Sequence, residues 1–207
     1  MNRHQIKYLY LFLCLLLTSC AGGYRMVRPD RINYQNLQNA DSVSFSYHYD
    51  ILRQANNKRY YKKEIKRNIR LVAIRIINES DSITDLNRYE FYAGKNKAAL
   101  LPVTSVYKKL KQKWWPFLFY SLLTINSMET HCIGGRCRTR SKIVFPIGVF
   151  IAAGNIIYAS ISNQHFKKEL SYFEYKPKSL QPGEHYYALI GIQEDNYEPI
   201  TLHLTIP

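Results

Sequence analysis

The chain has 207 residues, of which 46% are hydrophobic, 14% aromatic and 21% charged. This composition excludes a disordered, collagen-like or coiled-coil protein, because a globular apolar content is combined with no dominant residue type. The 29 Lys and Arg residues outnumber the 15 Asp and Glu residues, giving a net charge of +14 that predicts an anionic neighbour. The 18 tyrosines favour a strand-rich fold, since aromatic residues suit half-buried pleated surfaces.

The N-terminal segment has the three regions of a secretory signal peptide. Arg3 and Lys7 are followed by an apolar run at 8–17 and then by small residues. The run is too short to span a bilayer, which needs about 20 apolar residues. We therefore predict that residues 1–19 are removed on export. Their removal takes away two of the 29 basic residues and no acid, which leaves 27 basic residues against 15 acids.

The last residues of this segment, LTSC at 17–20, resemble the lipobox of bacterial lipoproteins. The resemblance implies cleavage before Cys20, a diacylglycerol on its thiol and acylation of its new amine. Two or more acyl chains make such an anchor stable. In that family an Asp just after the cysteine often signals retention in the inner membrane. This chain has AGG at 21–23 instead, so the resemblance favours an outer-membrane protein facing the periplasm. The alternative is an ordinary secreted protein whose cleavage site contains a cysteine.

The remaining cysteines form one pair. Cys14 leaves with the signal peptide and Cys20 takes the lipid, so Cys132 and Cys137 remain for a disulfide in an oxidising compartment. His131 adjoins this pair and offers the alternative of a zinc site. Structural zinc sites usually have four ligands, and no second ligand cluster is present in the sequence. We therefore predict a disulfide and no metal.

Short strands are predicted on both sides of the centre of the chain. A tether at 20–40 precedes alternating apolar and polar residues at 43–49, which are typical of a strand. Residues 58–70 carry seven basic residues and one acid, and suit either a short amphipathic helix or a solvated approach to the next strand. Further strands are predicted at 70–77, 87–93, 98–107, 170–175, 185–192 and 200–206.

These strands favour a mainly β fold, an antiparallel sandwich of immunoglobulin-like type with halves at 41–107 and 169–207. Together with the lipobox, Tyr49-Asp50, Ile77-Asn78 and the sequence PGE at 182–184 loosely resemble uncharacterised Gram-negative envelope lipoproteins with immunoglobulin-like folds. That resemblance implies no particular activity.

An apolar insertion is predicted at 108–168. Two uncharged stretches, 114–128 and 143–164, lack strand alternation, so we expect an α-helical hairpin with the cysteine loop at its tip. The second stretch has the length of a bilayer span, and the hairpin suits a membrane, the sandwich itself or a partner protein. The residues expected to contact a membrane or anion are Lys108, Lys109, Lys111, Lys113, Trp114, Trp115, Arg136, Arg138, Arg140 and Lys142.

No catalytic motif is found. The five histidines of the mature chain are scattered, and there is no nucleophile elbow, zinc-protease motif or phosphate loop. We therefore predict a non-enzymatic envelope lipoprotein that binds membrane lipid and an envelope protein, with no cofactor and no nucleic acid. The alternatives are an accessory subunit of an export, motility or transport assembly and a ligand-binding lipoprotein.

Overall fold

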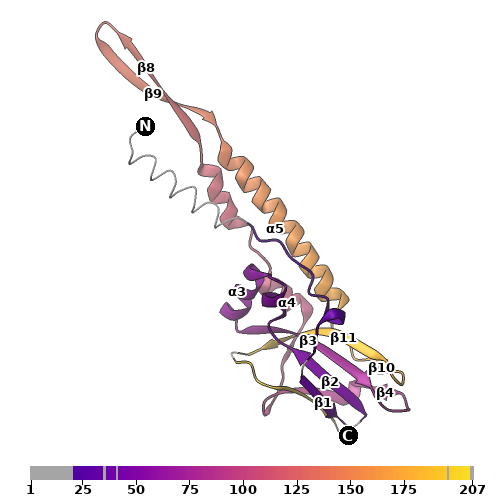
Figure 1. Ribbon diagram of the computed structural model, residues 1–207. Helices are drawn as coiled ribbons and strands as arrows, with labels where there is room; N and C mark the ends of the chain where they lie inside the picture. The colour runs from indigo at the N-terminus through magenta and orange to yellow at the C-terminus, as the bar shows by residue number, and fades with distance from the viewer. Residues whose placement is uncertain (1–20, 35, 41, 195, 206–207) are drawn as a thin grey trace. The chain divides into compact units, whose positions relative to one another are not determined.

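The computed structural model describes residues 21–34, 36–40, 42–194 and 196–205 (Figure 1). The predicted signal peptide and Cys20, the predicted lipidation site, lie outside the described residues. The chain divides into two compact units. Of the described residues, unit 1 contains 21–23 and 112–162, and unit 2 contains the rest.

Unit 2 is built on a five-stranded antiparallel sheet of order β1-β2-β3-β11-β7. Its strands are β1 (Asn36–Ala40), β2 (Val43–His48), β3 (Ile69–Asn78), β11 (His185–Gln193) and β7 (Leu100–Leu101). A smaller antiparallel sheet consists of β12 (Ile200–Leu204), β5 (Tyr89–Ala93) and β6 (Asn96–Lys97), and β4 (Thr84–Asp85) pairs with β10 (Ser179–Leu180). The predicted mainly β, antiparallel fold is confirmed.

The central strand β3 supplies both cores of unit 2. Side chains alternate across a strand, so Val72 and Ile74 face the smaller sheet, where they pack with Phe91 and Leu202. Leu71 and its alternate neighbours face the opposite side and join the helical core. Burial on both faces explains why β3 reads as an almost continuous apolar run.

Helices cover the second face of the central sheet. They are α2 (Ile51–Gln54), α3 (Lys58–Lys66), α4 (Val103–Leu110) and the end of α5 (Ile147–Tyr172). Tyr60 of α3 is buried with Phe166 and Leu170 of α5, while three of the four lysines of α3 are exposed and Lys63 is half-buried. Of the two interpretations of 58–70, the amphipathic helix is therefore the one that the structure has.

Three expectations for unit 2 were wrong. The predicted tether contains the edge strand β1. The predicted strand at 98–107 contains only the short β7 before α4 begins after Pro102, because proline cannot donate to a sheet but suits a helix start. The predicted strand at 170–175 begins as the last turn of α5, where burial of Phe166 and Leu170 at a spacing of four residues favours helix.

The predicted α-helical hairpin in the insertion was also wrong. Unit 1 contains the 3-10 segment η3 (Trp115–Leu122), the antiparallel strands β8 (Ile125–Ile133) and β9 (Arg136–Phe145), and α5 as far as Ser162. Gly134 and Gly135 have φ values of 58° and 78°. Two adjacent residues with positive φ form the tight turn that joins two strands, so the predicted cysteine loop is a β-hairpin.

Close backbone approach holds η3 against the first turn of α5. The Gly148 amide donates to the Leu123 carbonyl at 2.9 Å. A Cβ on Gly148 would lie 1.8 Å from the Tyr120 carbonyl oxygen, so any larger residue would force the two segments apart.

Asn78 is a buried hydrogen-bonding centre at the end of β3. Its Nδ2 donates to the carbonyls of Ser82 at 2.8 Å and Leu180 at 3.0 Å. Its Oδ1 accepts from the Ser80 amide and from the Thr84 hydroxyl, each at 3.1 Å. The side chain thus ties the loop after β3 to β10, and its residue is fully buried.

Replacing Asn78 by Ala is expected to lower the free energy of unfolding by about 3 kcal/mol, because several buried polar groups lose their partner at once. The measurement is chemical denaturation of the purified protein, followed by circular dichroism. Asn96→Ala on the exposed strand β6 is the matched control, with an expected change below about 0.5 kcal/mol. Similar changes for the two variants would contradict the role assigned to Asn78.

Candidate membrane-contacting surface

Exposed apolar side chains gather on η3 and the residue before it. They are Trp114, Trp115, Leu118, Phe119 and Leu122. Phe119 is 65% exposed and Leu122 is 76% exposed, whereas Phe117 of the same segment is buried. Scattered exposed apolar residues are ordinary on a protein surface, but a contiguous group of large ones marks a contact surface.

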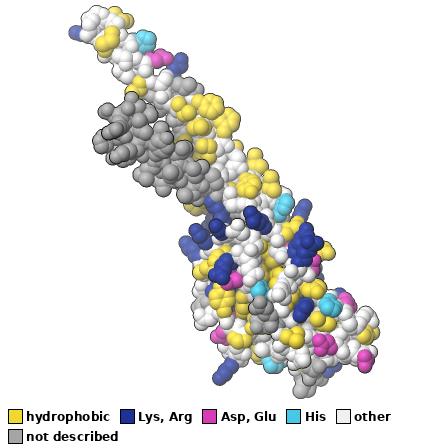
Figure 2. Space-filling model, viewed as in Figure 1, with side chains coloured by type: hydrophobic (Ala, Val, Ile, Leu, Met, Phe, Trp, Pro, Cys, Tyr) yellow, Lys and Arg dark blue, Asp and Glu magenta, His cyan; other side chains and the backbone are white. Residues whose placement is uncertain are grey.

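The unit 1 part of α5 is apolar on opposite sides. Its inner side carries the small residues Gly148, Ala152 and Ala159, which are buried. Its outer side carries Val149, Phe150, Ile157, Tyr158 and Ile161, which are exposed. Figure 2 shows apolar side chains gathered over the N-terminal half of α5. A helix that is apolar all round is normally covered by protein or lipid. We call these five residues and the five at η3 the apolar surface.

None of the helices among the described residues has the length and apolar character of a membrane span. The expectation that residues 143–164 form a span-length helix was therefore wrong. Residues 143–145 belong to β9, and α5 begins only at Ile147. Pro146 separates the two elements because it interrupts strand pairing.

The β8–β9 hairpin carries its cations on one face. Arg136, Arg138, Arg140 and Lys142 are spaced by two residues, so their side chains leave β9 on the same side. The β8 residues directly opposite them are Ile133, His131, Glu129 and Ser127. All four cations are exposed, and we call this side of the hairpin the basic face.

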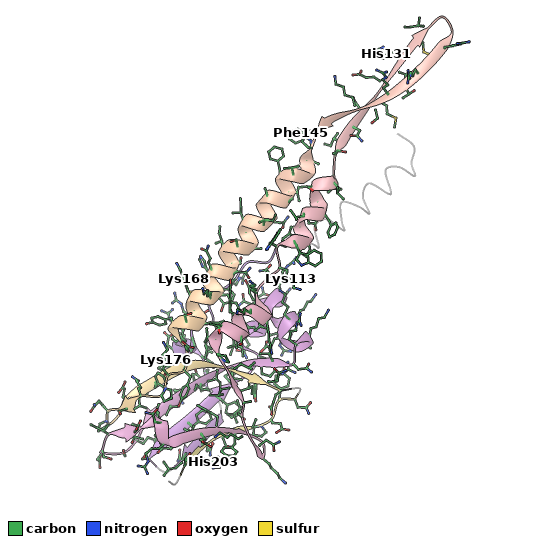
Figure 3. The ribbon with its side chains drawn as sticks, turned by 180° about the vertical axis from the view of Figure 1, so that it is seen from behind. Lys113, His131, Phe145, Lys168, Lys176 and His203 are labelled. Atoms are coloured by element: carbon green, nitrogen blue, oxygen red, sulfur yellow. A yellow bond between two sulfur atoms is a disulfide. The ribbon has the colours of Figure 1, made fainter. Side chains whose placement is uncertain are left out.

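Among the described side chains, the opposite side of the hairpin carries no charged one. There Cys132 lies opposite Cys137, and the two form a disulfide. Thr130 lies opposite Thr139, with hydroxyl oxygens 3.1 Å apart. Figure 3 shows His131 near the tip of the hairpin and Phe145 at the other end of β9. Phe145 stacks on Phe150 of α5 with ring centroids 5.4 Å apart, so the hairpin meets the apolar surface at its base.

The other predicted lysines lie elsewhere. Lys113 is exposed in unit 1, next to Trp114. Lys108, Lys109 and Lys111 belong to unit 2, at the end of α4. The predicted set of membrane or anion contacts is therefore divided between the two units.

In unit 2, cations from three helices form one basic surface. Lys111 and Lys167 both lie over the ring of Tyr107, with Nζ atoms 5.6 Å and 5.8 Å from its centroid. Lys63 of α3 donates to the Lys111 carbonyl. Glu64 and Glu169, the acids on α3 and on α5, are buried, so the exposed side chains of this layer are strongly positive.

Burial raises the pKa of the Glu64 carboxyl group to about 7. Its Oε1 accepts from the Leu71 amide at 2.7 Å, which holds the start of β3 against α3. That hydrogen bond and the nearby Arg70 act in the opposite direction but do not outweigh desolvation. The carboxyl group is thus partly neutral at physiological pH.

Sequence reasoning missed the side chains that hold the N-terminal residues. Glu169, the first residue of the predicted second half of the sandwich, accepts from the amides of Val27 and Arg28, each at 2.9 Å. Asn57 both donates to and accepts from the backbone of Arg25, each at 2.8 Å. No motif identifies these residues, because single polar side chains acquire the role only through the fold.

Unit 2 also has a groove of about 720 Å³ beside these residues. Its lining includes Met26, Arg28, Lys168, Tyr172 and Tyr187. A groove of this size suits the ligand-binding alternative.

The histidines do not gather into a reactive site. His48 pairs with the side chain of Gln54, His131 lies beside Glu129, and His203 contacts the ring of Tyr92. Within the described ranges, no three His, Cys, Asp or Glu residues are placed to hold a metal ion. Comparisons with protein-family models, with curated proteins and with solved structures find no match to this chain.

Removal of the disulfide is expected to loosen the hairpin alone. In Cys132→Ser/Cys137→Ser, the short closed loop loses about 2 kcal/mol of stabilisation, so amides of β8 and β9 should exchange up to about 30-fold faster. Hydrogen exchange with mass spectrometry measures this, and peptides from β3 and β11 are the internal control. Unchanged exchange in the hairpin would contradict the expectation.

The raised pKa of Glu64 makes stability depend on pH. The unfolded carboxyl group ionises near pH 4.5 and the folded one near pH 7, so stability falls as the pH rises between these values. The expected loss in the free energy of unfolding is about 3 kcal/mol. Glu64→Gln should abolish this loss, and the variant should be more stable than the wild type at pH 8. Thermal unfolding at pH 4.5 to 8 measures both proteins.

Glu184→Gln is the matched control for this pH series. Hydrogen bonds from Lys178 and from the Gln181 amide lower the pKa of Glu184, so its titration acts in the opposite direction. This variant should keep the decline between pH 4.5 and pH 7. A Glu64→Gln protein with the same pH profile as the wild type would rule out the assignment.

Proposed function

We propose that this protein is a non-enzymatic cell-envelope lipoprotein, anchored by an acylated Cys20, whose unit 1 associates with a membrane and whose β-rich unit 2 is a binding or structural module. It faces the periplasm from the outer membrane. The immunoglobulin-like type of its sandwich also stays a prediction. The signal-peptide pattern and the lipobox support the location in the cell envelope, and the apolar surface of unit 1 supports the membrane contact.

The observation that carries the proposal is the apolar surface. Ten large side chains on η3 and α5 face outward, including Trp114 and Trp115, which suit the interface between head groups and hydrocarbon. Insertion of such side chains to the depth of the head groups does not need a spanning helix. The lack of a spanning helix among the described residues is therefore compatible with a protein that lies on the bilayer.

The basic face of the hairpin supports an anionic bilayer in particular. Each cation near an anionic surface contributes about 1 kcal/mol of attraction. Arg136, Arg138, Arg140 and Lys142 point to one side, so all four can meet head-group phosphates together. This contribution weakens with salt, whereas burial of apolar side chains does not.

Association without the lipid anchor tests the proposal. Cys20→Ser is produced behind an ordinary cleavable signal peptide, and the cell membranes are washed with high salt and then with alkaline carbonate. We expect the protein to remain with the membrane until detergent is added, because the apolar surface holds it. Fractionation and immunoblotting measure the distribution.

Two triple variants of the Cys20→Ser protein provide the comparison. Phe150→Gln/Ile157→Gln/Ile161→Gln removes part of the apolar surface and should release the protein into the soluble fraction. Ile65→Gln/Ile83→Gln/Leu100→Gln changes three other exposed apolar side chains, which belong to unit 2, and should leave the protein bound. If the Cys20→Ser protein itself is soluble, the membrane contact is wrong, and a stoichiometric partner in mild detergent would favour the assembly subunit.

A further inference from the structure

Residues 21–28, which we call the strap, have no regular secondary structure, yet side chains bind their backbone. The first three belong to unit 1. The Ala21 amide donates to the Asn155 side chain of α5 at 2.6 Å. Gln112 accepts from the Gly22 amide at 3.1 Å and donates to the Gly22 carbonyl at 2.6 Å, as a neighbouring strand would.

Gly23 allows the strap to lie close to α5. A Cβ at this position would lie 2.5 Å from the hydroxyl oxygen of Tyr158, one of the residues of the apolar surface. The start of the strap is therefore held on α5 by Asn155 and packed against Tyr158.

The other five residues of the strap belong to unit 2 and are bound in the same way. The buried Asn57 pairs with both backbone groups of Arg25, and the buried Glu169 accepts from the amides of Val27 and Arg28. Tyr24 also donates to Glu169 at 2.5 Å. Burial and the adjacent carboxylate raise the pKa of the Tyr24 phenol, which keeps its proton in place as the donor.

Aromatic packing fixes the same segment. The Tyr24 ring lies 5.2 Å from that of Tyr60 and 5.1 Å from that of Phe166. Release of the strap would expose this ring and leave the Glu169 carboxylate buried without these donors, which is costly. The strap is thus part of the folded protein and does not act as a flexible tether.

We propose that the seated strap fixes the point at which the acyl anchor begins, directly beside α5, so that an anionic phospholipid bilayer meets the apolar surface of unit 1. This inference rests on the proposed lipidation of Cys20. Consecutive Cα atoms are about 3.8 Å apart, so no slack separates residue 20 from Ala21. The acyl chains and the apolar side chains therefore enter the same bilayer from one region of unit 1.

Hydrogen exchange of the Cys20→Ser protein, purified in mild detergent, tests the strap without any bilayer. We expect the amides of Ala21, Gly22, Arg25, Val27 and Arg28 to exchange at least about 30-fold more slowly than an unstructured chain. Asn57→Ala should remove protection at Arg25, while Asn96→Ala should not. Exchange of the strap at the rate of an unstructured chain would overturn the inference.

The lipidated protein tests the position of the anchor. Trp114 and Trp115 are its two tryptophans and lie in unit 1, so quenching of their fluorescence by brominated acyl chains reports contact with vesicles of anionic phospholipid. The triple variant Phe150→Gln/Ile157→Gln/Ile161→Gln weakens the contact that unit 1 makes with the bilayer without the acyl anchor. We still expect quenching in this variant when it is lipidated, because the anchor holds the apolar surface at the bilayer. Insertion of ten Gly and Ser residues between Cys20 and Ala21 in this variant should then lower the quenching at least about twofold. The longer linker lowers the effective concentration of the apolar surface at the bilayer.

The same ten residues added after Pro207 are the control and should leave quenching unchanged. Equal quenching with and without the inserted linker would overturn the proposed exit point. Mass spectrometry of the purified protein separates the two proposals. An unacylated Cys20 would overturn the proposed function and the membrane part of this inference, while the exchange experiment would still decide whether the strap is seated.

Discussion

Burial of β3 on both faces is the constraint on which unit 2 depends. The strand pairs with β2 on one side and with β11 on the other, and its side chains enter two separate cores. One core requires the smaller sheet and the other requires the helical layer, because neither face of β3 can be left in water. Glu64 and Asn78 then fix the two ends of the strand by hydrogen bonds to Leu71 and Leu180.

The same helical layer that completes the second core also holds the N-terminal strap. Phe166 and Leu170 of α5 are buried against the sheet, and Glu169 between them binds the backbone of Val27 and Arg28. A substitution that disturbs the end of α5 would therefore affect both the core and the hydrogen bonds to Val27 and Arg28.

Unit 1 differs from unit 2 in that many of its large apolar side chains are exposed. Its part of α5 uses small residues such as Ala152 on the inner side and large ones such as Phe150 on the outer side, which is the reverse of a helix in a water-soluble core. The β8–β9 hairpin adds four cations on one face. Large exposed apolar side chains combined with exposed cations are compatible with the proposed contact with a bilayer interface, where hydrocarbon and phosphate lie within a few ångströms of one another.

The sequence by itself determined the elements whose signal is local. Alternation at 43–49 and the apolar runs around β3, β11 and β12 indicated strands, since period and β-branched residues reflect burial directly. The sequence did not distinguish an uncharged helix at 114–128 from η3 followed by a strand. The β-hairpin depends on the positive φ values of Gly134 and Gly135, which appear only in the structure. Only the tertiary structure placed the cations of β9 on one face and brought Asn57, Gln112 and Glu169 to the strap. These side chains are far apart in the chain, and their roles arise from pairing and packing across it, which no local pattern records.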